Sequence, residues 1–408
     1  MIKLGSDESL PNGWQWVEAY SVMDVRDGTH DSPKSVENGI PLVTSKNLIG
    51  GKIDFSTCNM ISEDDHVAIS KRSAVDDGDI LYAMIGTIGN PVIVEKQFEF
   101  SIKNVALFKF TKSSQVYNRY IYHFLNSDLA TRQFESNSRG GTQKFVSLGN
   151  IRGLQIPLPP IAEQKRIAAI LDKADAIRRK RKQAIQLADD FLRSVFLDMF
   201  GDPIANNKNW NVVNLGKLAP NKGDMVDGPF GSSVNTKTDY IDDGEIPVIR
   251  TKNVSLEGEF VCNDLKFMTR EKFLTIHRSH VTPGDIVLTK VGTIGNVCIF
   301  PEKYKEAVLS TTGSCRIRID ELMINKDYLF FFLKYYRPKM HEIASAGVQP
   351  FLNMKHIKGF EVPMPSMELQ SKFSTLVKQV TVSKAKLKEA SESQLFNSLS
   401  QKAFAGEL

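Results

Sequence analysis

The chain has 408 residues, which is too long for one ordinary hydrophobic core, so two or three domains are expected. Its hydrophobic content of 41%, charged content of 24% and lack of a long apolar run exclude a membrane-spanning protein. The net charge of +5 permits nucleic-acid binding without establishing it.

The four cysteines are scattered and form no C-x-x-C pair. This usage is typical of a reducing compartment, so we expect free, mostly buried thiols and a cytoplasmic location. They are Cys58, Cys262, Cys298 and Cys315.

Three stretches of the first half of the chain return in the second half, each displaced by 206 residues. IPLVTSKNL from Ile40 returns as IPVIRTKNV, and GDILYAMIGTIGNPVIV from Gly78 returns as GDIVLTKVGTIGNVCIF. GGTQKFVSLGNIRGLQIPLPP from Gly140 returns as AGVQPFLNMKHIKGFEVPMPS. This period is far longer than that of solenoid repeats, so the chain is predicted to contain a duplicated domain.

The first globular unit is expected over residues 1–160 and its copy over 201–366, both mostly β. In chain order, a hairpin is predicted over Gly78–Val94 and a short helix over Tyr117–Asn126. The copy repeats them as a hairpin over Gly284–Phe300 and a helix over Asp327–Tyr336.

A long helix is predicted between the two units, over residues 161–200. Apolar residues recur there at steps of three and four, from Ile167 to Met199. Prolines 157, 159 and 160 precede the helix, and Gly201 and Pro203 end it. At about 1.5 Å per residue the run would span about 58 Å, so its apolar stripe needs a partner.

The C-terminal residues 367–408 supply that partner. Phe373, Leu376, Val380 and Leu387 follow the alternation of four and three that is typical of a coiled coil. The predicted fold is therefore α+β, with two mostly-β domains separated by two long helices in an antiparallel coiled coil. The arrangement has a pseudo-twofold axis, which matches the local twofold axes of DNA.

Polar residues in the repeated loops are candidates for DNA contact. A lysine or arginine can bind phosphate or guanine, an amide can bond adenine, and glycine loops let backbone amides approach phosphate. For each, a solvated loop or a tight turn is the alternative interpretation. The candidates are Lys46, Asn47, Gly86, Thr87, Gly89, Asn90, Arg139, Thr142, Gln143, Lys144, Arg250, Lys252, Asn253, Gly292, Thr293, Gly295, Asn296 and Gln349.

Catalytic and metal-binding motifs are missing from the sequence. It has no G-x-x-x-x-G-K-[ST] motif for a nucleotide-driven motor and no G-x-G-x-x-G cradle after a strand. His277 and His280 lack further ligands at metal spacing and are interpreted as structural. We therefore expect no catalytic residues and no metal in this chain.

The duplicated unit, the segment IPLPPIAEQKRIA, the segment FLRSVFLDMFGDP and the terminal KAFAGEL together resemble the specificity subunit of type I restriction–modification systems. P-x-P-P-x-x-E-Q-x-x-I, from Pro157 to Ile167, is quite specific to that family, and DGPFGS from Asp227 is a familiar element of its recognition domains. The second copy departs from the pattern, because Leu369 stands where Glu163 would align.

The resemblance implies two target-recognition domains, over 1–160 and 201–366, each reading one half of a bipartite double-stranded DNA site, with spacer helices over 161–200 and 367–408. It implies two methyltransferase subunits bringing S-adenosylmethionine, and two motor–nuclease subunits using ATP and Mg²⁺. The helices would dock the methyltransferases through outward-facing residues. The docking candidates are Glu163, Gln164, Arg178, Arg179, Lys180, Arg181, Lys182 and Gln370.

Two other function classes stay open at this point. A self-contained DNA methyltransferase would bind its cofactor as an isolated chain, although the missing motifs argue against it. A scaffold that binds only protein would show no sequence-selective DNA binding in the assembled complex.

Overall fold

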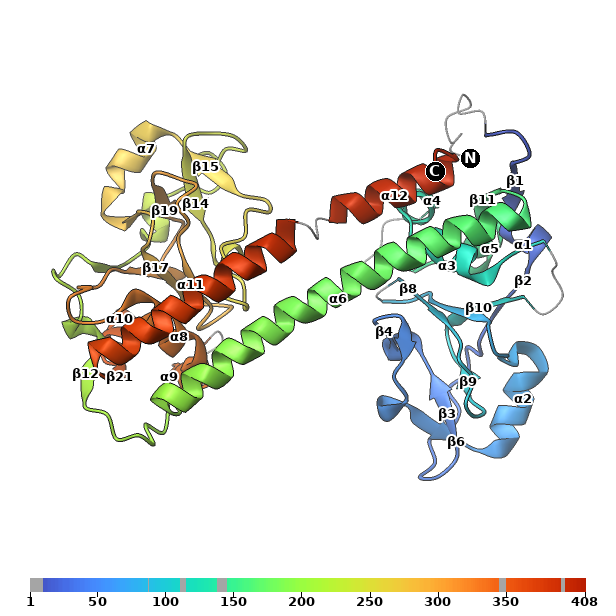
Figure 1. Cartoon of the computed structure of the whole chain (residues 1–408), viewed down its shortest axis with the longest axis horizontal. Helices are drawn as coiled ribbons and strands as arrows, with labels where there is room; N and C mark the ends of the chain where they lie inside the picture. Colours follow the sequence, from blue (N-terminus) through green and yellow to red (C-terminus); the bar gives the residue numbers. More distant parts are fainter. Residues whose placement is uncertain (1–9, 87, 111–114, 138–144, 345–349, 390–392) are drawn as a thin grey trace. The chain divides into compact units, whose positions relative to one another are not determined.

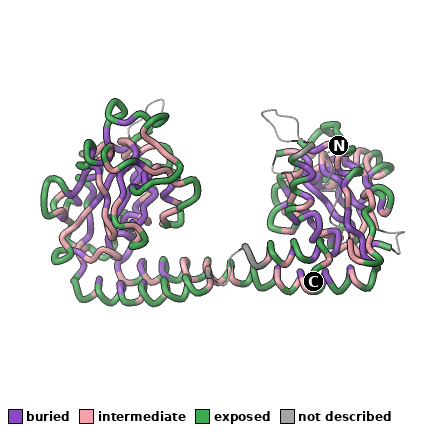
Figure 2. Tube along the Cα trace, turned by 90° about the horizontal axis from the view of Figure 1, so that it is seen from above, coloured by how far each residue is buried: buried purple, intermediate pink, exposed green. Residues whose placement is uncertain are grey.

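The computed structural model describes residues 10–86, 88–110, 115–137, 145–344, 350–389 and 393–408 (Figure 1). The chain divides into two compact units, one formed by Met1–Gln183 with Lys388–Leu408 and the other by Ala184–Leu387. The boundary falls inside the long helix α6 (Ile161–Phe200), so each unit includes one part of this helix. In each unit, buried residues are concentrated in the interior (Figure 2).

The described elements of the first unit follow one another from strand β1 to strand β11, and helix α12 joins them from the C-terminus. They are β1 (Gln15–Glu18), α1 (Ala19–Val22), β2 (Asp24–Asp27), β3 (Ile40–Val43), η1 (Ser45–Asn47), β4 (Leu48–Ile49), β5 (Lys52–Ile53), η2 (Phe55–Thr57), β6 (Asn59–Ile61), α2 (Glu63–Ser73), β7 (Ile80–Ala83), β8 (Gly89–Ile93), β9 (Ser101–Ile102), β10 (Val105–Lys109), α3 (Asn118–Leu125), α4 (Asp128–Asn137), α5 (Leu148–Arg152), β11 (Gln155–Leu158) and α12 (Ser393–Ala405).

The described elements of the second unit repeat this order after α6. They are β12 (Val212–Asn214), η3 (Leu215–Lys217), β13 (Met225–Asp227), η4 (Gly231–Ser233), β14 (Ile246–Ile249), η5 (Thr251–Asn253), β15 (Lys266–Met268), α7 (Arg270–Thr275), η6 (His277–Ser279), β16 (His280–Val281), β17 (Ile286–Thr289), β18 (Val297–Ile299), β19 (Ala307–Leu309), β20 (Ser314–Ile317), α8 (Lys326–Tyr335), α9 (Arg337–Ile343), α10 (Met354–Lys358), β21 (Glu361–Pro363) and α11 (Met367–Glu389).

The two units share the topology of the four-stranded sheet, and the second sheet has one more strand in the second unit than in the first. A four-stranded sheet has the order β2-β10-β7-β8 in the first unit and β13-β20-β17-β18 in the second. A second sheet has the order β6-β3-β9 in one and β15-β14-β19-β16 in the other, with β3–β9 and β14–β19 parallel. The predicted hairpins are confirmed as the antiparallel pairs β7–β8 and β17–β18, and the predicted short helices as α3 and α8. The duplication read from the sequence is therefore a duplication of fold.

The four-stranded sheet of the first unit separates two cores, because side chains alternate between its faces. In the first unit, Ile80 and Tyr82 of β7 pack into a core with α1, α3, α4, α5, α6 and α12. Their neighbours Leu81 and Ala83 pack into the other core, which lies against the second sheet. Figure 1 shows the same order, from the helices through β8 and β10 to β3 and β6.

Helices α6 and α12 run antiparallel in the first unit. Arg166 donates to the backbone oxygen of Leu408 at 2.7 Å, and twelve residues further along α6 the Arg178 guanidinium lies 4.8 Å from the ring centre of Phe396. Phe404 of α12 is buried, with its ring 5.4 Å from that of Tyr120. The C-terminal helix therefore belongs to the hydrophobic core of the first unit.

Helices α6 and α11 also run antiparallel, in the second unit. Phe200 packs on Phe373 with ring centres 5.4 Å apart, and Asp189 accepts from Lys384 at 2.6 Å. The predicted C-terminal helix is described as two helices, α11 and α12, and residues 390–392 between them lie outside the described residues.

The apolar stripe of α6 is less continuous than the sequence predicts. Ile167 and Leu192 of the predicted stripe are buried, and so is Phe196, but Ile177 is 50% exposed. No helix among the described residues combines the length and the apolar character needed to cross a membrane.

Candidate nucleic-acid interface

An Asp-Gly pair ends an outer strand of the four-stranded sheet in both units. The backbone N–H of Gly28 donates to Val105 O at 2.9 Å, and that of Gly228 donates to Ser314 O at 3.2 Å. A Cβ at Gly28 would lie 2.3 Å from the carbonyl oxygen of Ile102, and one at Gly228 would meet Thr311 at similarly short range. Glycine is required at both positions because the chains approach too closely for any side chain.

The aspartates of these pairs hold basic side chains. In the first unit, the buried Asp27 pairs with Arg72, and its Oδ2 lies 2.9 Å from His30 Nε2. In the second, Asp227 accepts from Lys290 at 3.3 Å and lies 3.9 Å from Arg278.

Arg72 and Arg278 occupy equivalent places 206 residues apart. Their side chains are 62% and 71% exposed, so both present a guanidinium to solvent beside a fixed carboxylate. The sequence comparison did not single out these arginines, although the pattern R-S-x-V-x-x-G-D-I begins at each of them. The shared spacing of 206 residues is the signal that could have found them.

In the Lys-Asn turns after β3 and β14, the two asparagines are buried and the two lysines are exposed. The side chain of Asn47 is buried, accepts from Thr44 N at 2.9 Å and donates to Asp54 O at 3.1 Å. Asn253 accepts from Arg250 N and donates to Val261 O at 2.9 Å. The prediction of base contact by these two asparagines is wrong, because each amide is used to close its own turn.

The cations of these turns lie at the surface. Lys46 is exposed, whereas Lys252 forms an ion pair with Asp264, which also lies 3.4 Å from Arg250. The hydrogen bond from Lys252 is the main cause that lowers the pKa of Asp264, so this carboxylate stays charged.

The two identical GTIGN segments form turns of positive φ. Gly86 and Gly292 have φ of 76° and 74°, and a Cβ at either would meet nothing within 4 Å. Gly89 and Gly295 also have positive φ, and Gly295 is packed against Arg337. The tight-turn interpretation is confirmed, and the first glycine of each segment lies at an open surface.

The asparagines that end these segments differ. Asn90 is exposed with φ of 47°, whereas Asn296 is buried and donates to Val254 O at 3.0 Å. The prediction of DNA contact is therefore wrong for Asn296, whose amide lies inside the unit. Thr293 is exposed.

Six candidates lie outside the described residues: Thr87, Arg139, Thr142, Gln143, Lys144 and Gln349. Phe145 directly follows residues 138–144, and Phe351 follows residues 345–349 after Pro350; both phenylalanines are described. Phe145 forms an antiparallel bridge with Ile85, and Phe351 forms the same bridge with Val291.

Backbone hydrogen bonds gather these segments at one end of the sheet. In the second unit, Lys290 N donates to Gly313 O at 2.7 Å, and Leu352 N donates to Lys290 O at 3.0 Å. In the first, Ser45 donates to Asn104 O, and Asn104 N donates to Thr29 O. We name this end the loop edge. It comprises residues 27–30, 44–47, 84–86, 88–90, 102–105 and 145 in the first unit, and 227–230, 250–253, 290–296, 310–313 and 351 in the second.

The glutamines predicted for partner docking are internal. Gln164 is fully buried, accepts from Tyr117 N at 2.8 Å, and donates to Gln115 O and Pro159 O. Gln370 is also buried and accepts from Asn325 N at 2.8 Å. The prediction that these glutamines face outward is wrong, because both fasten the start of a long helix to the domain beside it.

The other docking candidates lie on the surface of α6. Glu163 pairs with Arg166 at 2.7 Å, while Arg178 and Arg179 pair with the buried Asp175. The candidates beyond them are Lys180 and Lys182, both exposed, and Arg181, which is partly buried.

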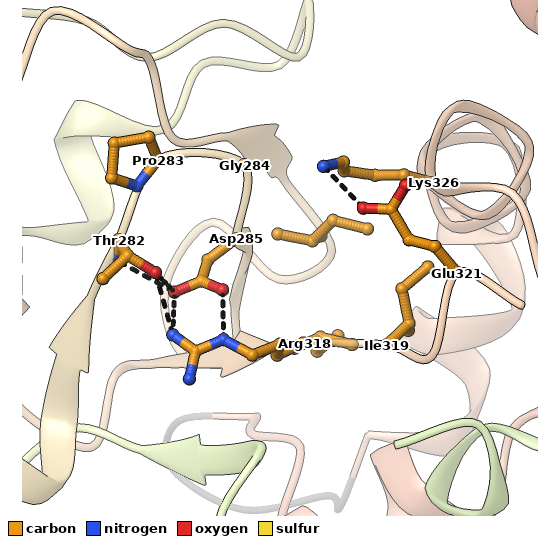
Figure 3. Close-up of a pocket in the computed structure, with 10 residues that line it drawn as sticks. Thr282, Pro283, Gly284, Asp285, Arg318, Ile319, Glu321 and Lys326 are labelled. Atoms are coloured by element: carbon orange, nitrogen blue, oxygen red, sulfur yellow. Dashed lines mark hydrogen bonds and ion pairs between the residues drawn. The ribbon is translucent and has the colours of Figure 1, made fainter. Parts of the chain in front are cut away.

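A pocket of about 200 Å³ lies in the second unit, beside the turn before β17 (Figure 3). Asp285 accepts from Arg318 NH2 at 2.7 Å and from Thr282 N at 2.8 Å, and Glu321 pairs with Lys326. Its charged lining residues are thus occupied with one another. Among the described residues, no group of three or more His, Cys, Asp or Glu side chains could hold a metal ion.

The four cysteines are free thiols. Burial raises the pKa of Cys298 and of Cys315 to about 12, so both stay protonated inside the second unit. Cys262 is exposed, which differs from the expected burial.

The comparisons with known proteins agree with the duplicated fold. The model of the type I restriction modification DNA specificity domain matches residues 11–187 and 207–395. The chain is 25% identical to the type I restriction enzyme EcoBI specificity subunit of Escherichia coli, over 98% of this chain and 87% of that protein. It is 21% identical to the type I restriction enzyme MjaIX specificity subunit of Methanocaldococcus jannaschii, over 90% and 87% respectively.

A solved structure shares the fold. The S subunit of a type I restriction-modification system from M. genitalium has a TM-score of 0.56 and 17% identity, covering 99% of this chain and 98% of its own. Since the family model matches both repeats and most of the chain, the protein belongs to the family of type I restriction–modification specificity subunits, with one copy of the DNA specificity domain in each half.

Proposed function

We propose that each unit reads one half of a bipartite double-stranded DNA site through its loop edge. The observation that carries this proposal is the equivalence of the two loop edges. Each combines an Asp-Gly turn, an arginine 206 residues from its counterpart and an open glycine turn. Two like readers on one chain suit a target in two parts.

The cations of the loop edge and of the arginines beside it suit phosphate. Lys46, Arg72 and Arg278 are exposed, so they reach the surface that a duplex would approach. Phosphate contacts position a protein on DNA, and contacts to base edges determine its sequence preference. Asp27 and Asp227 orient the arginines, which limits the rotamer freedom that binding would otherwise remove.

The chain performs no catalytic step in this proposal. Two methyltransferase subunits would bind the long helices and bring S-adenosylmethionine, and two motor–nuclease subunits would bring ATP and Mg²⁺. The exposed docking candidates on α6 are Arg178, Arg179, Lys180 and Lys182, and the length of the helices would set the gap between half-sites.

Methylation mapping tests the proposal. DNA from cells that express this chain with its cognate methyltransferase should carry methylation at one bipartite sequence. Exchanging residues 1–158 for the corresponding unit of a relative should change one half-site only. Methylation without a bipartite sequence, or a simultaneous change of both half-sites, would contradict the proposal.

A further inference from the structure

Each loop edge carries a phenylalanine that the fold leaves in solvent. Phe145 is 49% exposed and Phe351 is 44% exposed, at positions 206 residues apart. Exposing part of an aromatic ring forgoes some of the free energy of its burial, so two equivalent exposed rings call for a cause. Neither ring belongs to a hydrophobic core cluster of the described residues.

The backbone fixes the direction of both rings. The next residues, Val146 and Leu352, are buried at 1% and 0% exposure, and their N–H groups donate to Met84 O and Lys290 O, each at 3.0 Å. Successive residues of an extended segment point to opposite faces. The phenylalanine therefore points away from the core because its neighbour is anchored in it.

The surface beside each ring is open. Gly86 follows Ile85, the bridge partner of Phe145, and Gly292 follows Val291, the bridge partner of Phe351. A Cβ at either glycine would meet nothing within 4 Å. Among the described residues, each ring thus belongs to a segment bridged to the residue before an open glycine, where a flat partner could approach closely.

A second exposed ring lies at the other end of each loop edge, three residues after the aspartate. It is Phe230, 65% exposed, in the second unit, and the side chain of His30 is 59% exposed in the first. Planar rings flanked by basic side chains suit nucleic-acid bases, whose faces stack and whose thymine methyl groups accept apolar contact.

We propose that Phe145 and Phe351 make apolar contacts with DNA bases and determine sequence preference, each for its own half-site. This inference rests on the proposed function, because it assigns the base-contacting side chains of the same loop edge. An uncharged ring can discriminate between sequences but cannot contribute to the release of counterions.

The test uses the assembly of the full chain with its cognate methyltransferase subunits. Affinities are measured for cognate and for unrelated duplexes over a range of salt, for wild type, Phe145→Ala and Phe351→Ala. Each variant should lose about tenfold in discrimination between these duplexes, since one mismatched contact costs roughly 1–3 kcal/mol. Affinity for unrelated DNA and the salt slope should be unchanged, and Phe351→Tyr should retain the discrimination.

Matched controls separate this effect from a general loss of apolar surface. Phe98→Ala changes a ring of similar exposure in the first unit, and Leu322→Ala changes the 89% exposed leucine of the second. Neither position belongs to a loop edge, so both variants should behave as wild type. Methylation mapping should show relaxed sequence at the first half-site for Phe145→Ala and at the second for Phe351→Ala.

Four results would overturn the inference: unchanged discrimination, equal loss on cognate and unrelated DNA, loss at both half-sites together, or a lower melting temperature that accounts for the loss. Phe145→Leu, which keeps an apolar side chain, covers the case in which the alanine variant fails to fold. If the wild-type assembly itself prefers no sequence, the proposed function fails and this inference fails with it. If the wild type discriminates and the variants equal it, only the inference fails.

Discussion

Gln164 and Tyr117 are joined by a hydrogen bond of 2.8 Å, in which the buried amide oxygen of Gln164 accepts from the backbone nitrogen immediately before α3. Gln370 accepts from Asn325 N at the same distance, just before α8. The first turns of α6 and α11 are thus hydrogen-bonded to the residues just before α3 and α8, the helices that cover the sheets. The same hydrogen bond occurs in both units and connects the long helices to the domains.

Replacing Gln164 with alanine should destabilise the first unit. The change removes the hydrogen bonds that the buried Gln164 side chain makes with Tyr117 N, Gln115 O and Pro159 O. We expect a loss of about 2–4 kcal/mol, because each unsatisfied buried group costs roughly 1–3 kcal/mol. Urea unfolding in a Trp210→Phe background follows the first unit alone, since Trp14 and Trp16 then report.

Gln183→Ala is the matched control for Gln164→Ala, because Gln183 is an exposed glutamine of the same helix. It should change stability by less than about 0.5 kcal/mol. Equal unfolding midpoints for the Gln164 and Gln183 variants would show that the hydrogen bonds of Gln164 contribute nothing to the stability of the first unit.

The variant Phe404→Ala should destabilise the first unit although it lies at the far end of the chain. The buried ring contacts Tyr120 and Phe124, with ring centres 5.4 and 5.6 Å away. Truncating a buried phenylalanine costs about 3–5 kcal/mol. The same tryptophan readout should show the loss in the first unit, and Lys402→Ala, an exposed change two residues away, should not. An unchanged unfolding midpoint of the Trp14 and Trp16 signal would refute the placement of α12.

Acidification should weaken the first unit through His123. Burial lowers the pKa of His123 below its ordinary value of 6.5 and outweighs the hydrogen bond to Asp172 and the charge of the nearby Asp175, with Arg119 acting in the same direction as burial. Between that lowered pKa and 6.5 the unfolded chain binds more protons than the folded one, so stability rises with pH. The contribution is fully present above pH 6.5 and is lost as pH falls through this window.

The measurement for His123 is urea unfolding between pH 7.5 and 5.5. His123→Gln removes the titrating group and should flatten the curve, whereas His30→Gln, which changes an exposed histidine of the same unit, should leave the slope in place. A His123→Gln curve parallel to the wild-type curve would contradict the assignment. The carboxyl group of Asp172 affects stability in a more acidic range. Burial favours its neutral form, but the hydrogen bonds that it accepts from Arg119 and His123 outweigh that effect and lower its pKa.

Reversing Lys180 and Lys182 to glutamate should weaken binding of the proposed methyltransferase partner without lowering stability. Both side chains are exposed, so the change alters surface charge only. We expect a severalfold slower association and a weaker salt dependence, which are the usual effects of charges at the rim of an interface. Surface plasmon resonance at two ionic strengths measures both quantities, and unchanged association would remove these lysines from the docking surface.

Arg179→Glu should behave differently, since it is predicted to lower stability. It would leave the buried Asp175 beside a new negative charge, with Arg178 as its remaining partner. Breaking a buried ion pair typically costs about 3–5 kcal/mol, reduced here because the arginine is half exposed. A variant as stable as wild type would show that the pair is not needed.

The sequence by itself determined the duplication, the hairpins and the long helix. These features depend on local patterns: the spacing of 206 residues, strands flanking a glycine turn, and apolar residues at helical steps between Pro160 and Gly201. The repeated pattern also identified the family, because its motifs are contiguous in the chain.

Only the tertiary structure decided which polar residues are available. Five amide side chains of a kind usually found at the surface are buried and hydrogen-bonded to backbone. They are those of Asn47, Asn253, Asn296, Gln164 and Gln370. Phe145 and Phe351 carry apolar rings of a kind usually found in a core, yet they are exposed. The docking of α12 on the first unit joins residues almost 300 positions apart, such as Tyr120 and Phe404. Burial depends on contacts between distant segments, and no local pattern contains them.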